Sequence, residues 1–134
     1  MVAIRKAGEI SENTSLIDIG MMGVSGVTAM YLIEDEKKCL IDGGTRTEFK
    51  RIMNTPYEMN GFPPDIIIVT HSHWDHTQAI PAMRDSAAKQ GKTIEVLASE
   101  NAIPLLADQS YNDVFAPGPY ANITDVTALK KIMS

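Results

Sequence analysis

The stretch DIIIVTHSHWDHT, residues 65–77, decides the fold of this chain and the place of its chemistry. Residues 65–70 form a β-branched run without polar alternation, which predicts a strand buried on both faces. All three histidines of the chain, His71, His73 and His76, follow this run at once, together with Asp75. Because ligands gather at the carboxyl ends of strands in open α/β sheets, the stretch predicts a functional site at such an edge.

The spacing of these side chains favours metal binding. In extended backbone, side chains two residues apart point the same way, so His71 and His73 can face one metal ion. Asp75 and His76 lie in the turn into the next predicted helix and can reach a second ion. Imidazole and carboxylate groups are ligands of catalytic zinc, and they also suit iron or manganese. The alternative is a polar loop whose histidines serve only solubility or helix capping, and three histidines at this spacing favour metal over it.

The residues before this stretch predict strands. Short apolar segments predict strands at 2–10 and 15–19, and the glycine-rich residues 20–26 predict a loop. Residues 27–33 and 38–42 flank a charged turn and predict an antiparallel hairpin. A helix is predicted at 47–59, after Gly43 and Gly44 break the strand.

The residues after the histidines alternate between helix and strand signals. A helix is predicted at 77–90, with Pro81 near its first turn and Gly91 just past its end. A strand at 93–98 and a helix at 99–108 follow, and residues 125–134 give no firm assignment. Helix–strand alternation behind hairpins predicts an α/β fold whose mixed sheet carries helices.

Composition limits the class of protein. The 134 residues, 44% hydrophobic and 22% charged, predict one soluble globular domain, residues 1–134. The net charge is -5, and acidic and basic residues are interspersed along the chain. There is no extended cationic stripe, so no nucleic-acid partner is expected. No signal peptide or membrane span is recognisable, which predicts a cytoplasmic protein without a membrane partner. Cys39, the single cysteine, is expected to be a buried structural thiol.

Residues 70–77 resemble the His-x-His-x-Asp-His motif of the metallo-β-lactamase superfamily. The predicted hairpin, which ends in Asp42, Gly43 and Gly44, looks like the family's hairpin and Asp-Gly turn, and the resemblance covers roughly residues 10–108. It implies a metallo-β-lactamase-like αββα sandwich of two sheets. These residues would supply about the N-terminal half of that sandwich.

The resemblance also implies roles for particular residues. His71 and His73 would bind a first zinc ion, and Asp75 and His76 a second, two ions being expected in the complete site. Asp42 would steady the ligand loop without binding the metal itself, and a simple turn-forming aspartate is an equal alternative. The implied reaction is hydrolysis of an ester, thioester, amide or phosphoester in a small-molecule substrate by a hydroxide held between the metals. Asp75 would be catalytic, orienting that hydroxide or taking its proton.

The sequence departs from the family after the motif. Family members complete the site with two further histidines and a bridging aspartate downstream, and this chain has no histidine after His76. The domain is therefore expected to be incomplete at its C-terminus. Its uncovered sheet face would favour self-association or a partner half that completes the sandwich. The alternatives for function are di-iron redox or sulfur chemistry on the same scaffold, and a non-catalytic metal-binding module.

Overall fold

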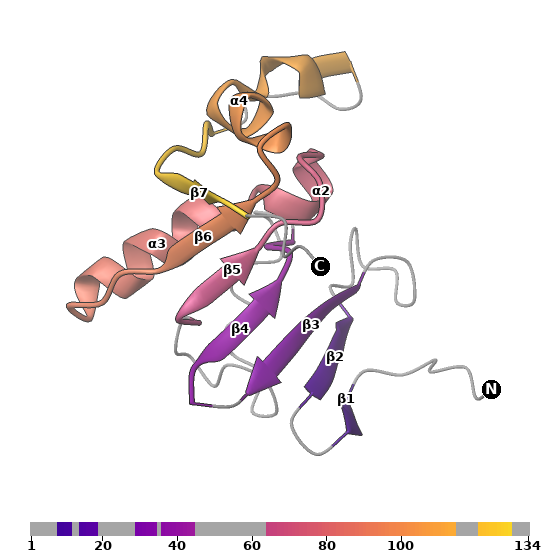
Figure 1. Cartoon of the computed structure of the whole chain (residues 1–134), viewed down its shortest axis with the longest axis vertical. Helices are drawn as coiled ribbons and strands as arrows, with labels where there is room; N and C mark the ends of the chain where they lie inside the picture. Colours follow the sequence, from indigo (N-terminus) through magenta and orange to yellow (C-terminus); the bar gives the residue numbers. More distant parts are fainter. Residues whose placement is uncertain are drawn as a thin grey trace, which may run out of the picture.

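A single mixed sheet runs through the computed structural model (Figure 1). The structure describes residues 8–11, 14–18, 29–34, 36–44, 64–114 and 121–129. Within these ranges the sheet has seven strands, which follow one another in chain order from β1 to β7. The loop predicted at 20–26 and the helix predicted at 47–59 lie outside the described residues.

Each of the first four strands is antiparallel to its neighbour. They are β1 (Gly8–Ser11), β2 (Thr14–Asp18), β3 (Ala29–Glu34) and β4 (Lys38–Ile41). The hairpin predicted around the charged turn is confirmed, since Ile33 pairs with Cys39 and Glu34 with Lys38. The turn between β3 and β4 is short, and a short turn can join two strands only if they run antiparallel.

The last three strands continue the sheet in parallel. They are β5 (Ile66–Ile68), β6 (Glu95–Ala98) and β7 (Val126–Ala128), and β5 is parallel to both β4 and β6. Parallel neighbours need a crossover connection, and the helical segment between β5 and β6 supplies one. No element was predicted over β7, because three residues are too few to show a period.

The helix predicted at 77–90 is observed from Ile80 onward, and a separate short helix precedes it where a turn was predicted. A short helix, α2 (Trp74–Thr77), ends before the turn residues Gln78 and Ala79, and α3 (Ile80–Lys89) begins after them. Pro81 explains the break, because proline lacks an N–H and is tolerated only in a first helical turn. Gly91 ends this segment with a φ of 72°, the left-handed conformation that favours glycine.

The remaining helices are short. The helix predicted at 99–108 is observed as α4 (Ala102–Ala107), and the side chain of Ser99 accepts a hydrogen bond from the N–H of Ala102. A 3₁₀ helix, η2 (Gln109–Val114), follows where the prediction gave no element. None of the helices described here is long and apolar enough to cross a bilayer.

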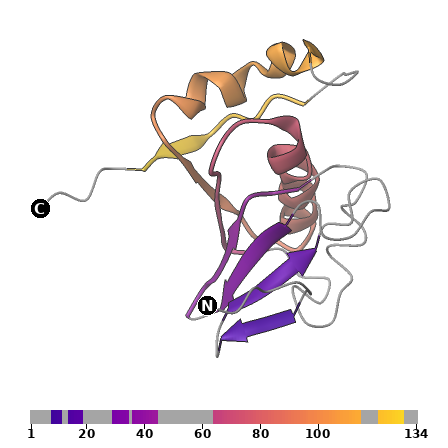
Figure 2. The ribbon, with the colours of Figure 1, turned by 90° about the vertical axis from the view of Figure 1, so that its right-hand side faces the viewer.

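The core lies between α3 and one face of the sheet, as Figure 2 shows. Leu32, Leu40, Ile67 and Val96 occupy neighbouring register positions on β3 to β6, and each is at most 1% exposed. From α3, the buried side chains are Ile80, Met83 and Ala87. Their spacing places them on one side of the helix, against the sheet.

The opposite face of the sheet is less covered. Ile66, Ile68 and Ile41 are half-buried among the described residues, and Tyr31 is 42% exposed. The prediction that β5 is buried on both faces is therefore confirmed for the face of Ile67 and met only in part on this face, because an apolar run does not reveal what covers each side. Cys39 lies on the same face and is also half-buried, and this burial raises the pKa of its thiol.

A close contact joins the turn after β4 to the start of α3. The N–H of Gly43 donates to the carbonyl of His76 at 2.7 Å. A Cβ atom at this position would lie 2.3 Å from Cγ1 of Ile80, which is fully buried. Only glycine therefore allows β4, α2 and α3 to approach this closely.

Gly43→Ala should lower the free energy of unfolding by about 1–3 kcal/mol, since a well-packed core resists an added methyl group. Urea denaturation followed by circular dichroism measures the effect. The control is Gly91→Ala, which meets no atom within 4 Å and carries only backbone strain. The double variant Gly43→Ala/Ile80→Ala should be less destabilised than the sum of its single changes. Additive effects would show that Gly43 and Ile80 do not compete for space.

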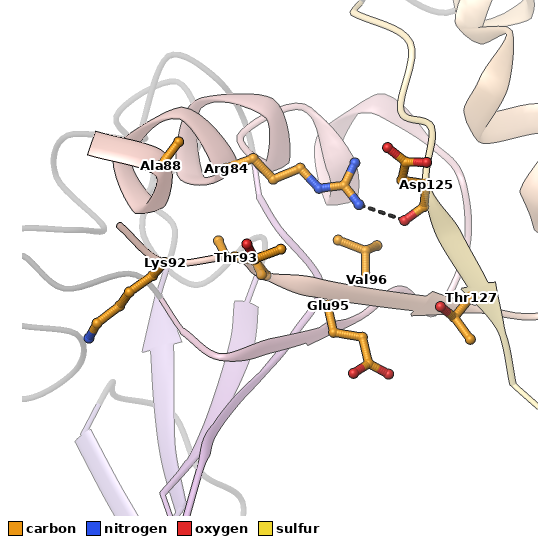
Figure 3. Close-up of a pocket in the computed structure, with 9 residues that line it drawn as sticks. Arg84, Ala88, Lys92, Thr93, Glu95, Val96, Asp125 and Thr127 are labelled. Carbon is orange, nitrogen blue, oxygen red and sulfur yellow. Dashed lines mark hydrogen bonds between the residues drawn. The ribbon is translucent and has the colours of Figure 1, made fainter. Parts of the chain in front are cut away.

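Beside α3 the structure has a cavity of about 850 Å³, which Figure 3 shows. Its walls come from α3, residues 92–96 and the start of β7, and no histidine lines it. Arg84 extends across it from α3 and donates to the carbonyls of Thr124 and Asp125, the latter at 2.8 Å. Asp125 has a φ of 55°, so Arg84 holds a left-handed turn at the start of β7.

Arg84→Ala should destabilise the chain by about 1–2 kcal/mol, because two hydrogen bonds from a charged donor are lost. Arg84→Lys should recover only part of this, since an ammonium cannot reproduce the guanidinium fork. Hydrogen exchange at residues 126–128 should speed up with each variant. Lys89→Ala, on the exposed end of the same helix, is the control. If β7 were equally protected from exchange in Arg84→Ala, Arg84 would not hold the turn at the start of β7.

Candidate metal centre

The candidate centre lies where β4 and β5 end. These strands are parallel, and Ile41 pairs with Ile68, so the residues that follow each strand meet at the same edge of the sheet. Asp42 follows β4, and its N–H donates to the carbonyl of Ile68 at 2.8 Å. The histidine segment follows β5 and runs into α2.

Asp42 occupies the middle of this arrangement. Its backbone is left-handed, with a φ of 69°, a conformation that aspartate tolerates better than most residues. Its carboxylate is buried and accepts hydrogen bonds from the N–H of Thr70 at 2.8 Å and from Nδ1 of His76 at 3.0 Å. The hydroxyl of Thr70 lies 2.8 and 2.7 Å from the two carboxylate oxygens. A buried carboxylate requires such partners, and Asp42 has them.

The hydrogen bonds also keep Asp42 ionised. Burial raises the pKa of its carboxyl, but the bonds from His76 and from the N–H and hydroxyl of Thr70 outweigh burial, so the pKa lies below its ordinary value. A lowered pKa in the folded chain stabilises the fold above the unfolded pKa, and this contribution is lost as the pH falls through the folded pKa. At neutral pH the carboxylate is therefore an acceptor only.

The histidine rings lie close together. The ring of His71 lies 4.1 Å from that of His76 and 5.3 Å from that of His73, between centroids. His71 and His73 are exposed, and His76 is half-buried beside Asp42. Nδ1 of His71 is 2.9 Å from the hydroxyl oxygen of Thr70.

The backbone of the ligand loop is held from several sides. The hydroxyl of Thr77, which is fully buried, donates to the carbonyl of His73 at 3.1 Å, and the N–H of His76 donates to the same carbonyl at 3.0 Å. Gln78 is also buried and exchanges two hydrogen bonds with the backbone of Ala121. These bonds fix the direction in which α2 leaves the sheet, and with it the positions of the histidines.

The structure groups the predicted residues differently from the two pairs drawn from the sequence. Asp42, His71 and His76 each offer a ligand atom, and these atoms lie within 4.8 Å of one another. His73 is not in this group, although its ring contacts that of His71. Asp75 lies in α2, and its side chain is outside the described part of the structure. The assignment of His71, His73, Asp75 and His76 as metal ligands stays a prediction.

These donors suit a metal ion. Imidazole nitrogens are zinc ligands, and a metal-binding histidine typically donates its other ring N–H to a carboxylate or similar acceptor. The bond between Nδ1 of His76 and Asp42 has this form. The sequence indicated Asp42 only as a turn residue or a support, and it gave no sign of Thr70, whose hydroxyl contacts both Asp42 and His71.

Comparison with solved structures identifies the fold. The chain is similar to MEM-A1, a subclass B3 metallo-beta-lactamase from a soil metagenome library, at 18% identity and a TM-score of 0.64, over 93% of this chain and 46% of that one. BJP-1, a subclass B3 metallo-beta-lactamase of Bradyrhizobium japonicum, matches at 17% identity and a TM-score of 0.65, over 93% and 45%. A beta-lactamase from Chitinophaga pinensis matches at 24% identity and 0.59, over 91% and 43%.

These likenesses concern the fold. They confirm a metallo-β-lactamase-like fold of which the chain supplies about half, and the chain spans about half the length of the structures it matches. A search of curated proteins found no match. The model of the metallo-beta-lactamase superfamily matches residues 23–99, which is more than half of the chain and includes both the turn at Asp42 and the histidine segment. The chain therefore belongs to the metallo-beta-lactamase superfamily.

Proposed function

We propose that the chain carries part of the metal centre of a metal-dependent hydrolase. One observation carries the proposal: a buried carboxylate, Asp42, orients His76 beside His71 at the carboxyl ends of two parallel strands. The proposed substrate is a small molecule with an ester, thioester, amide or phosphoester bond. Membership of the superfamily supports this reaction class.

Zinc is the proposed metal, with two ions in the complete site. His71 and His73 would hold one ion, and Asp75 and His76 the other. When bound, the metal lowers the pKa of water to about 7 and polarises the bond under attack. The cytoplasmic location stays a prediction.

The residues of the chain have separate tasks in this proposal. Asp42 accepts a hydrogen bond from Nδ1 of His76, which would leave Nε2 of that ring available to hold a metal ion. Asp75 would accept the proton of the attacking water, which is the task of a general base. The exposed position of His71 and His73 at the sheet edge leaves the centre accessible to substrate.

Further polypeptide would complete both the site and the fold. The three histidines of the chain all lie at 71–76, so the remaining ligands expected of the family would come from elsewhere. The half-buried face, with Ile41, Ile66 and Ile68, would be covered by that same polypeptide, as a partner half or through self-association.

A non-catalytic metal-binding module is the second candidate, because one cluster of histidines without further imidazole ligands can bind an ion without turnover. Metal analysis and activity assays separate the candidates. Zinc with hydrolysis of an ester or phosphodiester supports the hydrolase, and metal binding without turnover in the completed protein supports the module. Iron with oxygen consumption would instead indicate redox chemistry on this scaffold.

The chain by itself should bind at most about one divalent ion well, because His71 and His73 supply two ligands where catalytic zinc usually takes about three from protein. His73→Ala should lower the zinc content and leave the far-ultraviolet circular dichroism unchanged, since His73 is exposed beyond the end of β5. Equilibrium dialysis measures the content, with Gln90→Ala as the control. Two tightly held ions per monomeric chain would contradict this expectation.

In the completed protein, Asp75→Asn should lower kcat by roughly 10²-fold or more and change KM far less, because the variant keeps its size but loses most of its basicity. Zinc at the His71 and His73 position should largely survive. The measurement is kcat, KM and metal content on the same samples, with an ester and a phosphodiester as substrates. An unchanged kcat on every hydrolysed substrate would remove Asp75 from the mechanism.

A further inference from the structure

We propose that Thr70 is a positioning residue of the metal centre, whose hydroxyl links Asp42 to His71 and thereby selects the nitrogen of His71 that faces the metal. Its oxygen lies 2.8 and 2.7 Å from the carboxylate oxygens of Asp42 and 2.9 Å from Nδ1 of His71. The three groups form a continuous hydrogen-bonded chain. The inference depends on the proposed function only where it names the metal.

The number of available hydrogens decides which group donates and which accepts in each of these hydrogen bonds. A threonine hydroxyl has one hydrogen, and an ionised carboxylate has none to donate. Both carboxylate oxygens lie within hydrogen-bond distance of the hydroxyl oxygen, so Thr70 must donate its hydrogen to Asp42. If it donated to His71 instead, the lone pairs of three oxygens would face one another at less than 3 Å.

The consequence for His71 follows directly. Because the hydrogen of the hydroxyl is used on Asp42, the contact with His71 forms only if Nδ1 of the ring donates to the oxygen of Thr70. The neutral ring therefore has its hydrogen on Nδ1, and Nε2 is the nitrogen that would bind the metal. His76 follows the same rule, since its Nδ1 donates to Asp42. The carboxylate of Asp42 thus determines the tautomer of two histidines, that of His76 directly and that of His71 through Thr70.

The backbone of Thr70 also holds the loop, through a bond that does not involve the hydroxyl. The backbone N–H of Thr70 separately donates to Asp42 at 2.8 Å, and the residue is exposed. Thr70→Val keeps this N–H and the shape of the side chain and removes only the hydroxyl. Thr70→Ser keeps the hydroxyl and removes a methyl group. The two variants therefore separate hydrogen bonding from packing.

The first measurement is the ring tautomer of each histidine in the metal-free, ¹⁵N-labelled full chain, by long-range ¹H–¹⁵N correlation at a pH where the rings are neutral. His71 and His76 should both show hydrogen on Nδ1 in the wild-type chain and in Thr70→Ser. In Thr70→Val, His71 should change to hydrogen on Nε2 and His76 should not. Hydrogen on Nε2 of His71 in the wild-type chain would overturn the proposal, whatever the variants do.

The second measurement is zinc affinity, by competition with a chromophoric chelator. Thr70→Val should bind zinc about 10- to 100-fold more weakly, the usual loss when a partner of a ligand is removed, and Thr70→Ser should bind as the wild type does. Equal affinity in all three chains would show that Thr70 does not position a ligand. If the wild-type chain has the expected tautomers and binds no zinc, zinc binding at His71 fails for this chain by itself, and the hydrogen-bonded link between Asp42, Thr70 and His71 stands.

Discussion

The buried carboxylate of Asp42 is the interaction on which the candidate centre depends. A carboxylate removed from water is costly unless hydrogen bonds satisfy it, and Asp42 obtains its bonds from Thr70 and His76. These partners come from the segment after β5, whereas Asp42 follows β4. The need to satisfy one charge therefore ties together the ends of two parallel strands and the first turn of α2. The backbone of Asp42 is left-handed at this junction, with a φ of 69°.

Backbone contacts around this charge fix the ligand segment independently of any metal. The N–H of Gly43 binds the carbonyl of His76, and the hydroxyl of Thr77 binds the carbonyl of His73. The close approach of Gly43 to Ile80 joins the same junction to the core, since Ile80 belongs to the packed face of α3. The histidine rings are thus positioned by the fold itself, which is the condition for a metal to bind without reorganising its ligands.

The two faces of the sheet differ in a way that bears on the proposed function. One face is packed against α3, and the other, which includes Ile41, Ile66 and Ile68, is half-buried among the described residues. The solved structures that share the fold are about twice as long as the part that matches. In the proposed function, a single covering element would exclude water from this face and bring the remaining ligands to the histidines. Stability and catalysis would then depend on the same association.

The sequence by itself determined the hairpin, the existence of the central strand β5, the family and the position of the histidines, because each is expressed in a local period or in a motif of adjacent residues. It placed His71 with His73 and His76 with Asp75, since spacing along the chain was the only geometry it contained. Only the tertiary structure decided that Asp42, 28 residues before Thr70 and 34 before His76, binds both of them. Only the structure also showed the role of Gly43 against Ile80, and which face of β5 is packed. The physical reason is that buried charges and close contacts are satisfied by whatever residues the sheet register brings together, and no local pattern records that register.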